Sequence, residues 1–333
     1  MIFHPTVMAL FVGSLLVTFM ILYSASYALL ILRKWDLQSG SELQLNLERK
    51  TYLISTLIAY AFGFELLSFF LYVFTADQMH TFFVGAMCAA GSLYANDYGY
   101  PTLIVKLVNF LLAGTWLILN YVDNRGYDYP LMKTKCFFFL LLVPLILLET
   151  FLQASYFLRI SPNIITSCCG TLFSADTFAL PTDTGFLSSI RAKAAFYMTL
   201  LLTVGTGFFF FLKGKGAYLF SAVSALAFAV SVVAIFSFIS SYIYELPTHH
   251  CPFCVLQKEY GYIGYLIYVT LLGATILGLS VGLLMPFRKI GSLSEILPSF
   301  QRKLAVTSSA LFLVFTAIVT VRILLSDLIL EGY

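Results

Sequence analysis

Long apolar runs alternate with short polar stretches along most of the chain. Eight runs reach the roughly 17–25 residues that an α-helix needs to cross the hydrocarbon core of a bilayer. Because backbone polar groups cannot stay unpaired in lipid, these runs predict helices rather than strands. We therefore expect an all-α, polytopic membrane helix bundle that forms one membrane domain in a lipid bilayer. The expected helices cover about 7–32, 51–75, 101–122, 136–160, 194–212, 217–243, 255–285 and 304–327.

Composition and charge placement add an orientation. Hydrophobic residues make up 60% of the chain and charged residues only 11%, against about 25% charged residues in soluble domains. Most of the 19 lysines and arginines fall in four loops that an eight-helix topology places on one face, and such loops are typically cytoplasmic. The sequence thus predicts a plasma (bacterial inner) membrane protein with both termini outside. The four loops are 33–50, 123–135, 213–216 and 286–303.

Two outer segments do not fit the simple alternation. Segment 80–100 is moderately apolar and ends in polar residues before Pro101. As a full span it would place the basic loops on opposite faces, so we expect a re-entrant or interfacial segment or an extension of the third helix. Segment 161–190 is rich in Ser, Thr and Pro, lacks basic residues, and is expected to be an extracytoplasmic loop.

The sharpest chemical motif is a Cys-x-x-Cys that follows two histidines, at His249, His250, Cys251 and Cys254. It lies where the expected seventh helix enters the membrane from outside. Helix N-terminal amides stabilise a thiolate, and a protonated imidazole beside it would lower the thiol pKa further. A low-pKa thiolate next to a second thiol is the working unit of disulfide exchange. We expect Cys251 to attack and Cys254 to resolve.

The stretch from Cys251 to Lys258 resembles the Cys-x-x-Cys-x-x-Gln-Arg stretch of the DsbB-type disulfide-forming quinone reductases. It is also similar to the membrane-embedded Cys-x-x-Cys of vitamin K epoxide reductases. The resemblance covers about eight of the 333 residues, and both families have four or five core helices. It implies that Cys251 and Cys254 pass electrons to a quinone, with Gln257 and Lys258 flanking it. Several tyrosines, Tyr260 among them, surround the motif and could line a flat quinone site.

A second cysteine pair, Cys168 and Cys169, lies in the loop 161–190. Adjacent cysteines close only a strained and therefore labile disulfide, which could carry electrons between Cys251/Cys254 and a soluble thioredoxin-like partner. The pair could equally bind a soft metal delivered by a metal-carrying protein. It is similar to the adjacent cysteines of MerT-type mercury-transport membrane proteins.

The same residues support other classes of function. Thiols and imidazoles suit copper, zinc or mercury, so a soft-metal binding or transport protein is an open alternative. A non-catalytic subunit of a larger membrane complex is another. The sequence has no nucleic-acid motif, and we expect no nucleic-acid partner. The metal interpretation draws on Cys251, Cys254, His249, His250, Cys168, Cys169, His80 and Cys88.

Three charged residues lie deep inside expected helices, away from their ends. Glu65 and Glu149 lie near the middle of the second and fourth helices, and Lys106 lies about a turn inside the third. Charges at such depth are costly unless they are paired or neutralised, so they mark functional candidates. We expect a proton relay or cation path, or a structural Glu–Lys pair.

Overall fold

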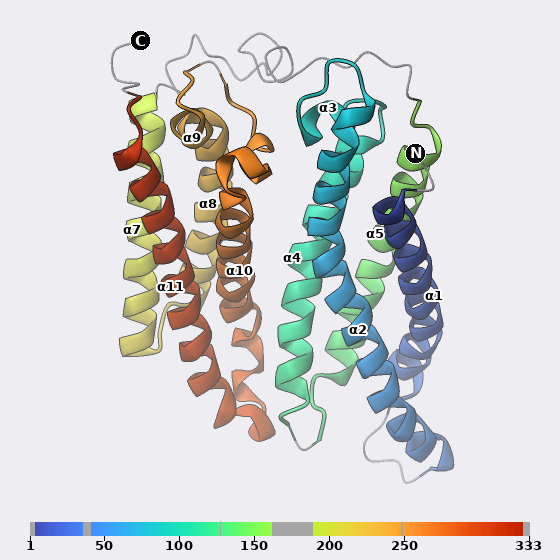
Figure 1. Cartoon of the computed structure of the whole chain (residues 1–333). Helices are drawn as coiled ribbons and strands as arrows, with labels where there is room; N and C mark the ends of the chain where they lie inside the picture. Colours follow the sequence, from blue (N-terminus) through green and yellow to red (C-terminus); the bar gives the residue numbers. More distant parts are fainter. Residues whose placement is uncertain (1–3, 36–40, 127, 162–188, 248, 329–333) are drawn as a thin grey trace. The chain divides into compact units, whose positions relative to one another are not determined.

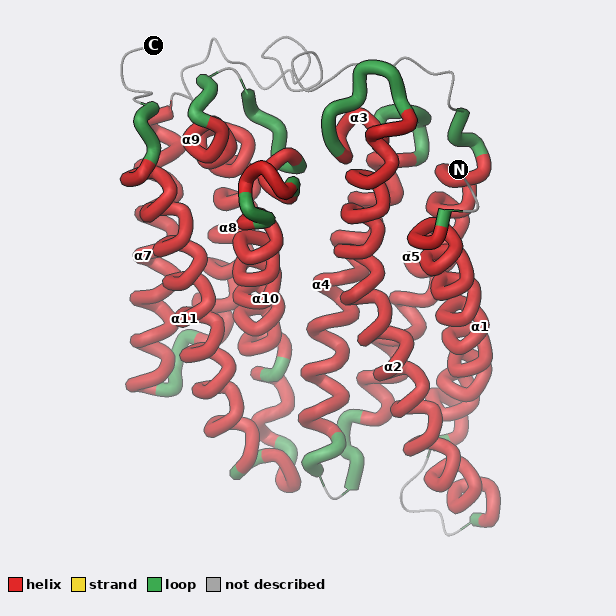
Figure 2. Tube along the Cα trace, viewed as in Figure 1, coloured by secondary structure: helices red, strands yellow, loops and turns green. Residues whose placement is uncertain are grey.

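The computed structural model describes residues 4–35, 41–126, 128–161, 189–247 and 249–328. Every long element in these ranges is a helix (Figure 2), and eight helices are long and apolar enough to cross a membrane. The predicted all-α polytopic bundle is therefore confirmed. Phe19, Leu67 and Leu201 are 75%, 70% and 70% exposed, as expected for side chains that face lipid.

The helix bounds depart most from the predicted ones at three starts, one of which is that of α11, at Ile296 rather than at 304. α2 begins before 51, in the basic loop, and α10 begins at Ile263 rather than at 255. A π-helical turn, η3 (Ile235–Ile239), joins α8 to α9 in one continuous span. The helices are α1 (Pro5–Lys34), α2 (Glu42–Met79), α4 (Gly99–Asp123), α5 (Met132–Leu158), α7 (Ser189–Lys213), α8 (Ala217–Ala234), α9 (Ser240–Tyr244), α10 (Ile263–Leu283) and α11 (Ile296–Leu325).

The chain, predicted as one membrane domain, separates into two compact units. Unit 1 takes the described residues of Met1–Thr75, Leu93–Ser161 and Lys289–Ile296. Unit 2 takes those of Ala76–Ser92, Pro162–Arg288 and Leu297–Tyr333.

In unit 1, α5 packs along both α1 and α4 (Figure 1). The core of this unit contains Phe62, Trp116 and Phe139, from α2, α4 and α5. The Phe62 ring centroid lies 5.0 Å from that of Trp116 and 6.0 Å from that of Phe139, distances at which aromatic rings attract each other. One aromatic cluster therefore packs three helices against one another.

In unit 2, α8 packs against both α7 and α10. Gly278 allows α8 and α10 to approach closely, because a Cβ atom at this position would lie 2.6 Å from Ser224 Cβ. Ser308 Oγ donates a hydrogen bond to the Ala274 carbonyl over 2.7 Å and so ties α11 to α10.

The segment 80–100 does not form a ninth span, because its helical stretches are too short to cross a membrane. It contains the 3₁₀ turn η1 (His80–Phe82) and the five-residue helix α3 (Ala89–Leu93), and α4 begins at Gly99. Most of the predicted extracytoplasmic loop 161–190, including Cys168 and Cys169, lies outside the described residues.

Candidate functional site: a buried thiol cluster

Three cysteines from two distant segments of the chain gather in unit 2. The sulfur of Cys88 lies 3.5 Å from that of Cys251. Together with the sulfur of Cys254 they form a group of three, and all three sulfurs lie within 4.8 Å of one another. The three side chains are buried, at 0%, 0% and 4% exposure for Cys88, Cys251 and Cys254. The cluster thus joins the Cys-x-x-Cys to a cysteine that precedes it by 163 residues.

The Cys-x-x-Cys does not begin a membrane helix, and that part of the prediction is wrong. Cys254 starts a short 3₁₀ turn, η4 (Cys254–Leu256), and a second turn, η5 (Lys258–Tyr260), follows. Gly261 then adopts a left-handed conformation, and α10 starts only at Ile263. The amides of its first turn are therefore not next to Cys251. The Phe253 amide donates to the Cys251 sulfur instead, over 3.5 Å.

Two tyrosine hydroxyls fix the backbone of the motif. Tyr244 of α9 donates to the Cys251 carbonyl over 2.6 Å. Tyr268 of α10 donates to the Pro252 carbonyl, also over 2.6 Å. The π-helical turn η3 precedes α9 and shifts its register relative to α8, so the direction of Tyr244 could not be derived from a regular helical period.

Asp77 and Gln257 hold the Cys88 segment in place. Asp77 Oδ1 accepts hydrogen bonds from the Ala89 amide over 3.3 Å and from Gln257 Nε2 over 3.2 Å. Gln257 Nε2 also donates to the Met87 carbonyl over 2.8 Å. Gln257, which the resemblance assigned to a quinone, thus links the two segments that carry the cysteines. Asp77 was missed because it lies just beyond the predicted second helix.

The other two residues assigned to a quinone differ in their surroundings. Lys258 is exposed. The Tyr260 ring meets the Tyr244 ring edge to face, with centroids 4.7 Å apart. Tyr260 therefore packs against the residue that supports Cys251.

The two histidines adjoin the cluster in different ways. His249 Nε2 lies 3.4 Å from the Cys254 sulfur, and its ring packs edge to face against Tyr244. His250 Nδ1 forms a 3.1 Å hydrogen bond with Ser241 Oγ. Burial lowers the pKa of both imidazoles below the ordinary value. The neutral form of each imidazole is therefore favoured, and this is the form that binds a metal. We had expected the protonated form beside the thiols.

The remaining predicted site residues lie elsewhere. His80 Nδ1 contacts the carbonyl of Asp77 and is not part of the three-sulfur cluster. Cys136, which was not predicted as a site residue, is buried in α5 of unit 1. Glu65, Lys106 and Glu149 meet in unit 1, in a separate buried polar network. The structure therefore separates the predicted candidates into a thiol site and a charged site.

Three thiols and a neutral imidazole can act as soft ligands to a metal or as partners in disulfide exchange. Comparisons of this chain with protein-family models, curated proteins and solved structures found no match. The geometry of the site is therefore the basis of its functional interpretation.

Proposed function

We propose that this integral membrane protein binds a thiophilic d¹⁰ metal ion through the thiolates of Cys88, Cys251 and Cys254. The observation that supports this most directly is the approach of three buried sulfurs to within 4.8 Å of one another. His249 is the fourth ligand in this proposal, because its Nε2 lies 3.4 Å from the Cys254 sulfur and burial favours its neutral form.

Known metal–ligand bond lengths fit these separations. Zinc–sulfur bonds of about 2.3 Å at tetrahedral angles place two sulfurs about 3.8 Å apart, and a sulfur and an imidazole nitrogen about 3.6 Å apart. The Cys88–Cys251 and His249–Cys254 distances are 3.5 and 3.4 Å. Small side-chain movements would bring both to ligand spacing. Cu⁺ and Hg²⁺ share the preference for thiolates, so the chemistry defines a class of ions.

The location of the site belongs to the same proposal. Within unit 2, the loops at 214–216 and 284–288 join one end of the helices, and the stretch 245–262 that carries Cys251 and Cys254 joins the other. The first two loops are basic, with Lys215 and Arg288 among their residues. Because basic loops favour the cytoplasm, the thiol cluster would face outward from a bacterial inner membrane.

The test is elemental analysis of the purified protein. Chelator-stripped, reduced protein would receive Zn²⁺, Cu⁺ or Hg²⁺ in separate samples, and we expect a single ion per chain for at least one of them. A structural zinc site is worth about 10–16 kcal/mol over four ligands, so Cys88→Ser or Cys254→Ser should weaken binding about 100-fold. Cys136→Ser is the matched control, since Cys136 lies in unit 1, and should bind normally.

A negative result would be equally clear. Absence of a bound ion in all three samples would overturn the proposal. Equal binding by Cys88→Ser and Cys136→Ser would assign the ion to other ligands. A Cys168→Ser/Cys169→Ser variant shows whether these two cysteines contribute.

Disulfide exchange is a second candidate, favoured by the 3.5 Å between the Cys88 and Cys251 sulfurs. Oxidation would break two S–H bonds and form one S–S bond. Two electrons and two protons would pass to a quinone, giving a quinol. The sulfurs need to approach from 3.5 Å to about 2.05 Å. The pair that reacts would be Cys88 and Cys251, with Cys254 as the thiol that reopens the bond.

Thiol trapping in membranes separates this candidate from metal binding. Alkylation before and after the addition of an oxidised quinone would reveal whether Cys88 and Cys251 lose their thiols together. If both cysteines stay reduced while a metal protects them from alkylation, the metal proposal is favoured. Quinone-dependent oxidation of metal-free protein would favour disulfide exchange.

A further inference from the structure

A buried polar network crosses the interior of unit 1. Lys106 Nζ of α4 lies 2.5 Å from Glu149 Oε1 of α5 and donates to Ser68 Oγ of α2 over 3.1 Å. Ser68 Oγ in turn donates to Glu65 Oε2 over 3.2 Å. Asn109 Nδ2 donates to Glu149 Oε2 over 2.5 Å. These five residues are at most 5% exposed, and three membrane helices contribute them.

The charges in this network do not balance. Ser68 Oγ contacts both Glu65 and Lys106, Lys106 pairs directly with Glu149, and the two carboxyls are close enough to interact. Two carboxyls therefore adjoin one ammonium group. Among the described residues, Lys106 alone forms an ion pair with either of them. Tyr72 of α2 faces Lys106, with its ring centroid 5.6 Å from Nζ, and Tyr156 of α5 adjoins Tyr72. Neither tyrosine supplies a positive charge.

One proton would remove the imbalance. With both carboxylates ionised, a net negative charge would be buried among membrane helices, which is strongly unfavourable. A proton held between Glu65 and Glu149 makes the network neutral and supplies a hydrogen bond between the two carboxyls. The helices α2 and α5 would then be joined through this shared proton.

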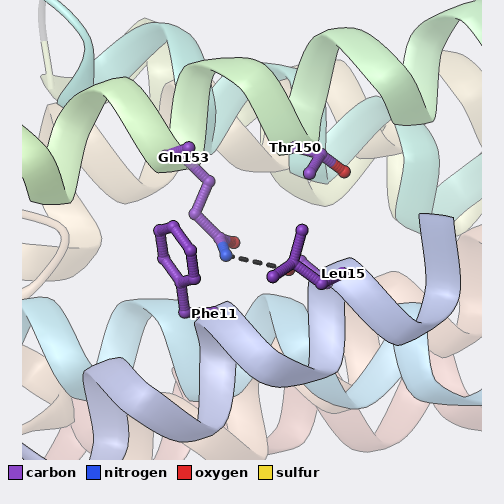
Figure 3. Close-up of a pocket in the computed structure, with 6 residues that line it drawn as sticks. Phe11, Leu15, Thr150 and Gln153 are labelled. Atoms are coloured by element: carbon purple, nitrogen blue, oxygen red, sulfur yellow. Dashed lines mark hydrogen bonds between the residues drawn. The ribbon is translucent and has the colours of Figure 1, made fainter. Parts of the chain in front are cut away.

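A small cavity lies between α1 and α5 (Figure 3), at residues of α5 that follow Glu149 within about one helical turn. Its volume of about 20 Å³ is enough for one water molecule. Gln153 of α5 points into the gap toward α1, and its Nε2 donates to Ser14 Oγ over 2.8 Å. Gln153 Oε1 is buried and has no hydrogen-bond partner among the described residues. A water in the cavity would satisfy this oxygen, with the hydroxyls of Ser14 and Thr150 as further partners.

Helical register connects the cavity to the network. Gln153 follows Glu149 by four residues, so both lie on the same side of α5 about 6 Å apart along the helix axis. Asn109 Oδ1 beside Glu149 is likewise buried without a partner among the described residues. Polar atoms with unused hydrogen-bonding capacity therefore occur at the cavity and in the network itself.

We propose that Glu65 and Glu149 share an exchangeable proton and that a water in the cavity at Gln153 relays it from the aqueous phase. Unit 1 then contains a proton-exchange site in addition to the thiol site of unit 2. Its ligand is a proton that comes from the aqueous phase. The cavity water passes one proton to the carboxylate and takes up another in its place, so no hydroxide is left behind and no redox step is involved. The proposal does not depend on metal binding by the cysteines.

Infrared spectroscopy of the purified full-length protein tests the shared proton, because a carboxylic acid has a carbonyl stretch that a carboxylate lacks. We expect an acid band at neutral pH that shifts in D₂O and disappears in Glu65→Gln. This variant keeps the Lys106–Glu149 ion pair and should fold. Asp123→Asn is the control, since Asp123 forms a balanced pair with Lys135 over 2.6 Å, and it should retain the band. A band that survives in Glu65→Gln, or no band in the wild type, would overturn the proposal.

The water pathway is tested by the rate of exchange. Ala154 lines the cavity, and Ala154→Leu should fill it and slow the D₂O shift of the band at least tenfold. Unchanged exchange in this variant would overturn the role of the cavity. A sodium titration at constant pH gives an independent arm. If Na⁺ abolishes the band, the cation displaces the proton, and the assignment of this site to a proton alone is wrong.

Discussion

Replacing Gly264 by alanine tests how the thiol site is positioned. Gly264 is buried in the first turn of α10, beneath the turn that starts at Cys254. A Cβ at this position would lie 2.8 Å from Val255 Cγ1 and 2.9 Å from the Val255 backbone carbon. Because a backbone atom is among these contacts, a change of rotamer cannot relieve the overlap. Val255 must move, and Cys254 is bonded to it.

The size of that movement follows from the overlap. Ordinary van der Waals contact begins near 3.4 Å, so the Val255 carbon at 2.9 Å must shift by 0.5 Å. Metal sites tolerate deviations of about 0.2 Å in ligand distance, and changes to supporting residues typically cost 10–100-fold in affinity. We expect a loss of that order in Gly264→Ala. Overpacking costs about 1–3 kcal/mol, and alanine recovers about 0.5–1 kcal/mol of helix propensity, so net stability should fall by about 1 kcal/mol.

Gly273→Ala is the matched control in the same helix. Its Cβ would meet only Leu311 Cδ1, at an ordinary 3.5 Å, so metal affinity should not change. Affinity would be measured by competition with a chromogenic chelator. The alkylation rate of Cys254 in metal-free protein gives a second readout, which should rise only in Gly264→Ala. If both variants match the wild type in affinity and alkylation, packing against α10 does not position Cys254 and the reasoning fails.

Three further predictions concern stability, measured by thermal unfolding in detergent. Lys106→Met should lower the free energy of unfolding by about 3–5 kcal/mol, because it leaves buried carboxylates without a counter-charge. The double variant Lys106→Met/Glu149→Met should recover most of this loss. Equal melting temperatures of the two variants would contradict this explanation. Tyr244→Phe should cost about 1–3 kcal/mol by leaving the Cys251 carbonyl without its donor, whereas Phe at the exposed Tyr262 should cost nothing measurable. Burial lowers the pKa of His249 and His250 below 6.5, so the unfolded chain binds more protons than the native one between that lowered pKa and pH 6.5. The free energy of unfolding should therefore fall as pH decreases through this range, and a His249→Gln/His250→Gln variant should lose this dependence.

The helix count could be predicted because lipid imposes one backbone solution on any long apolar run. Apolar character alone does not fix where a helix begins. Val255 and Leu256 continue the apolar run of α10, yet they form a buried turn. The sequence does carry a signal for the break at Gly261, whose left-handed conformation separates the turn from the helix. A hydrophobic pattern reports burial here, and it cannot distinguish a buried turn from a helix.

The two sites differed in how far sequence could define them. Glu65, Lys106 and Glu149 could be selected individually, since a charge inside an apolar run needs a partner. Cys88 offered no comparable signal, because a buried cysteine is also an ordinary packing residue. Its position depends on Asp77 and Gln257, whose hydrogen bonds link the segment before α3 to the Cys-x-x-Cys. Such tertiary hydrogen bonds have no local sequence pattern.

Burial of the thiols bears differently on the two candidate functions. Disulfide exchange requires an attacking thiolate to reach a sulfur, and the sulfurs of Cys88 and Cys251 belong to side chains with 0% exposure. Exchange with a soluble partner would therefore need this site to open. A metal site benefits from the same enclosure, because a closed set of ligands excludes competing water. In the metal proposal, His249 beside Cys254 would add a nitrogen ligand that disulfide exchange does not need. The variant His249→Ala thus separates the two candidates. It should weaken metal binding, but it should not change the distance between the Cys88 and Cys251 sulfurs or their capacity to form a disulfide.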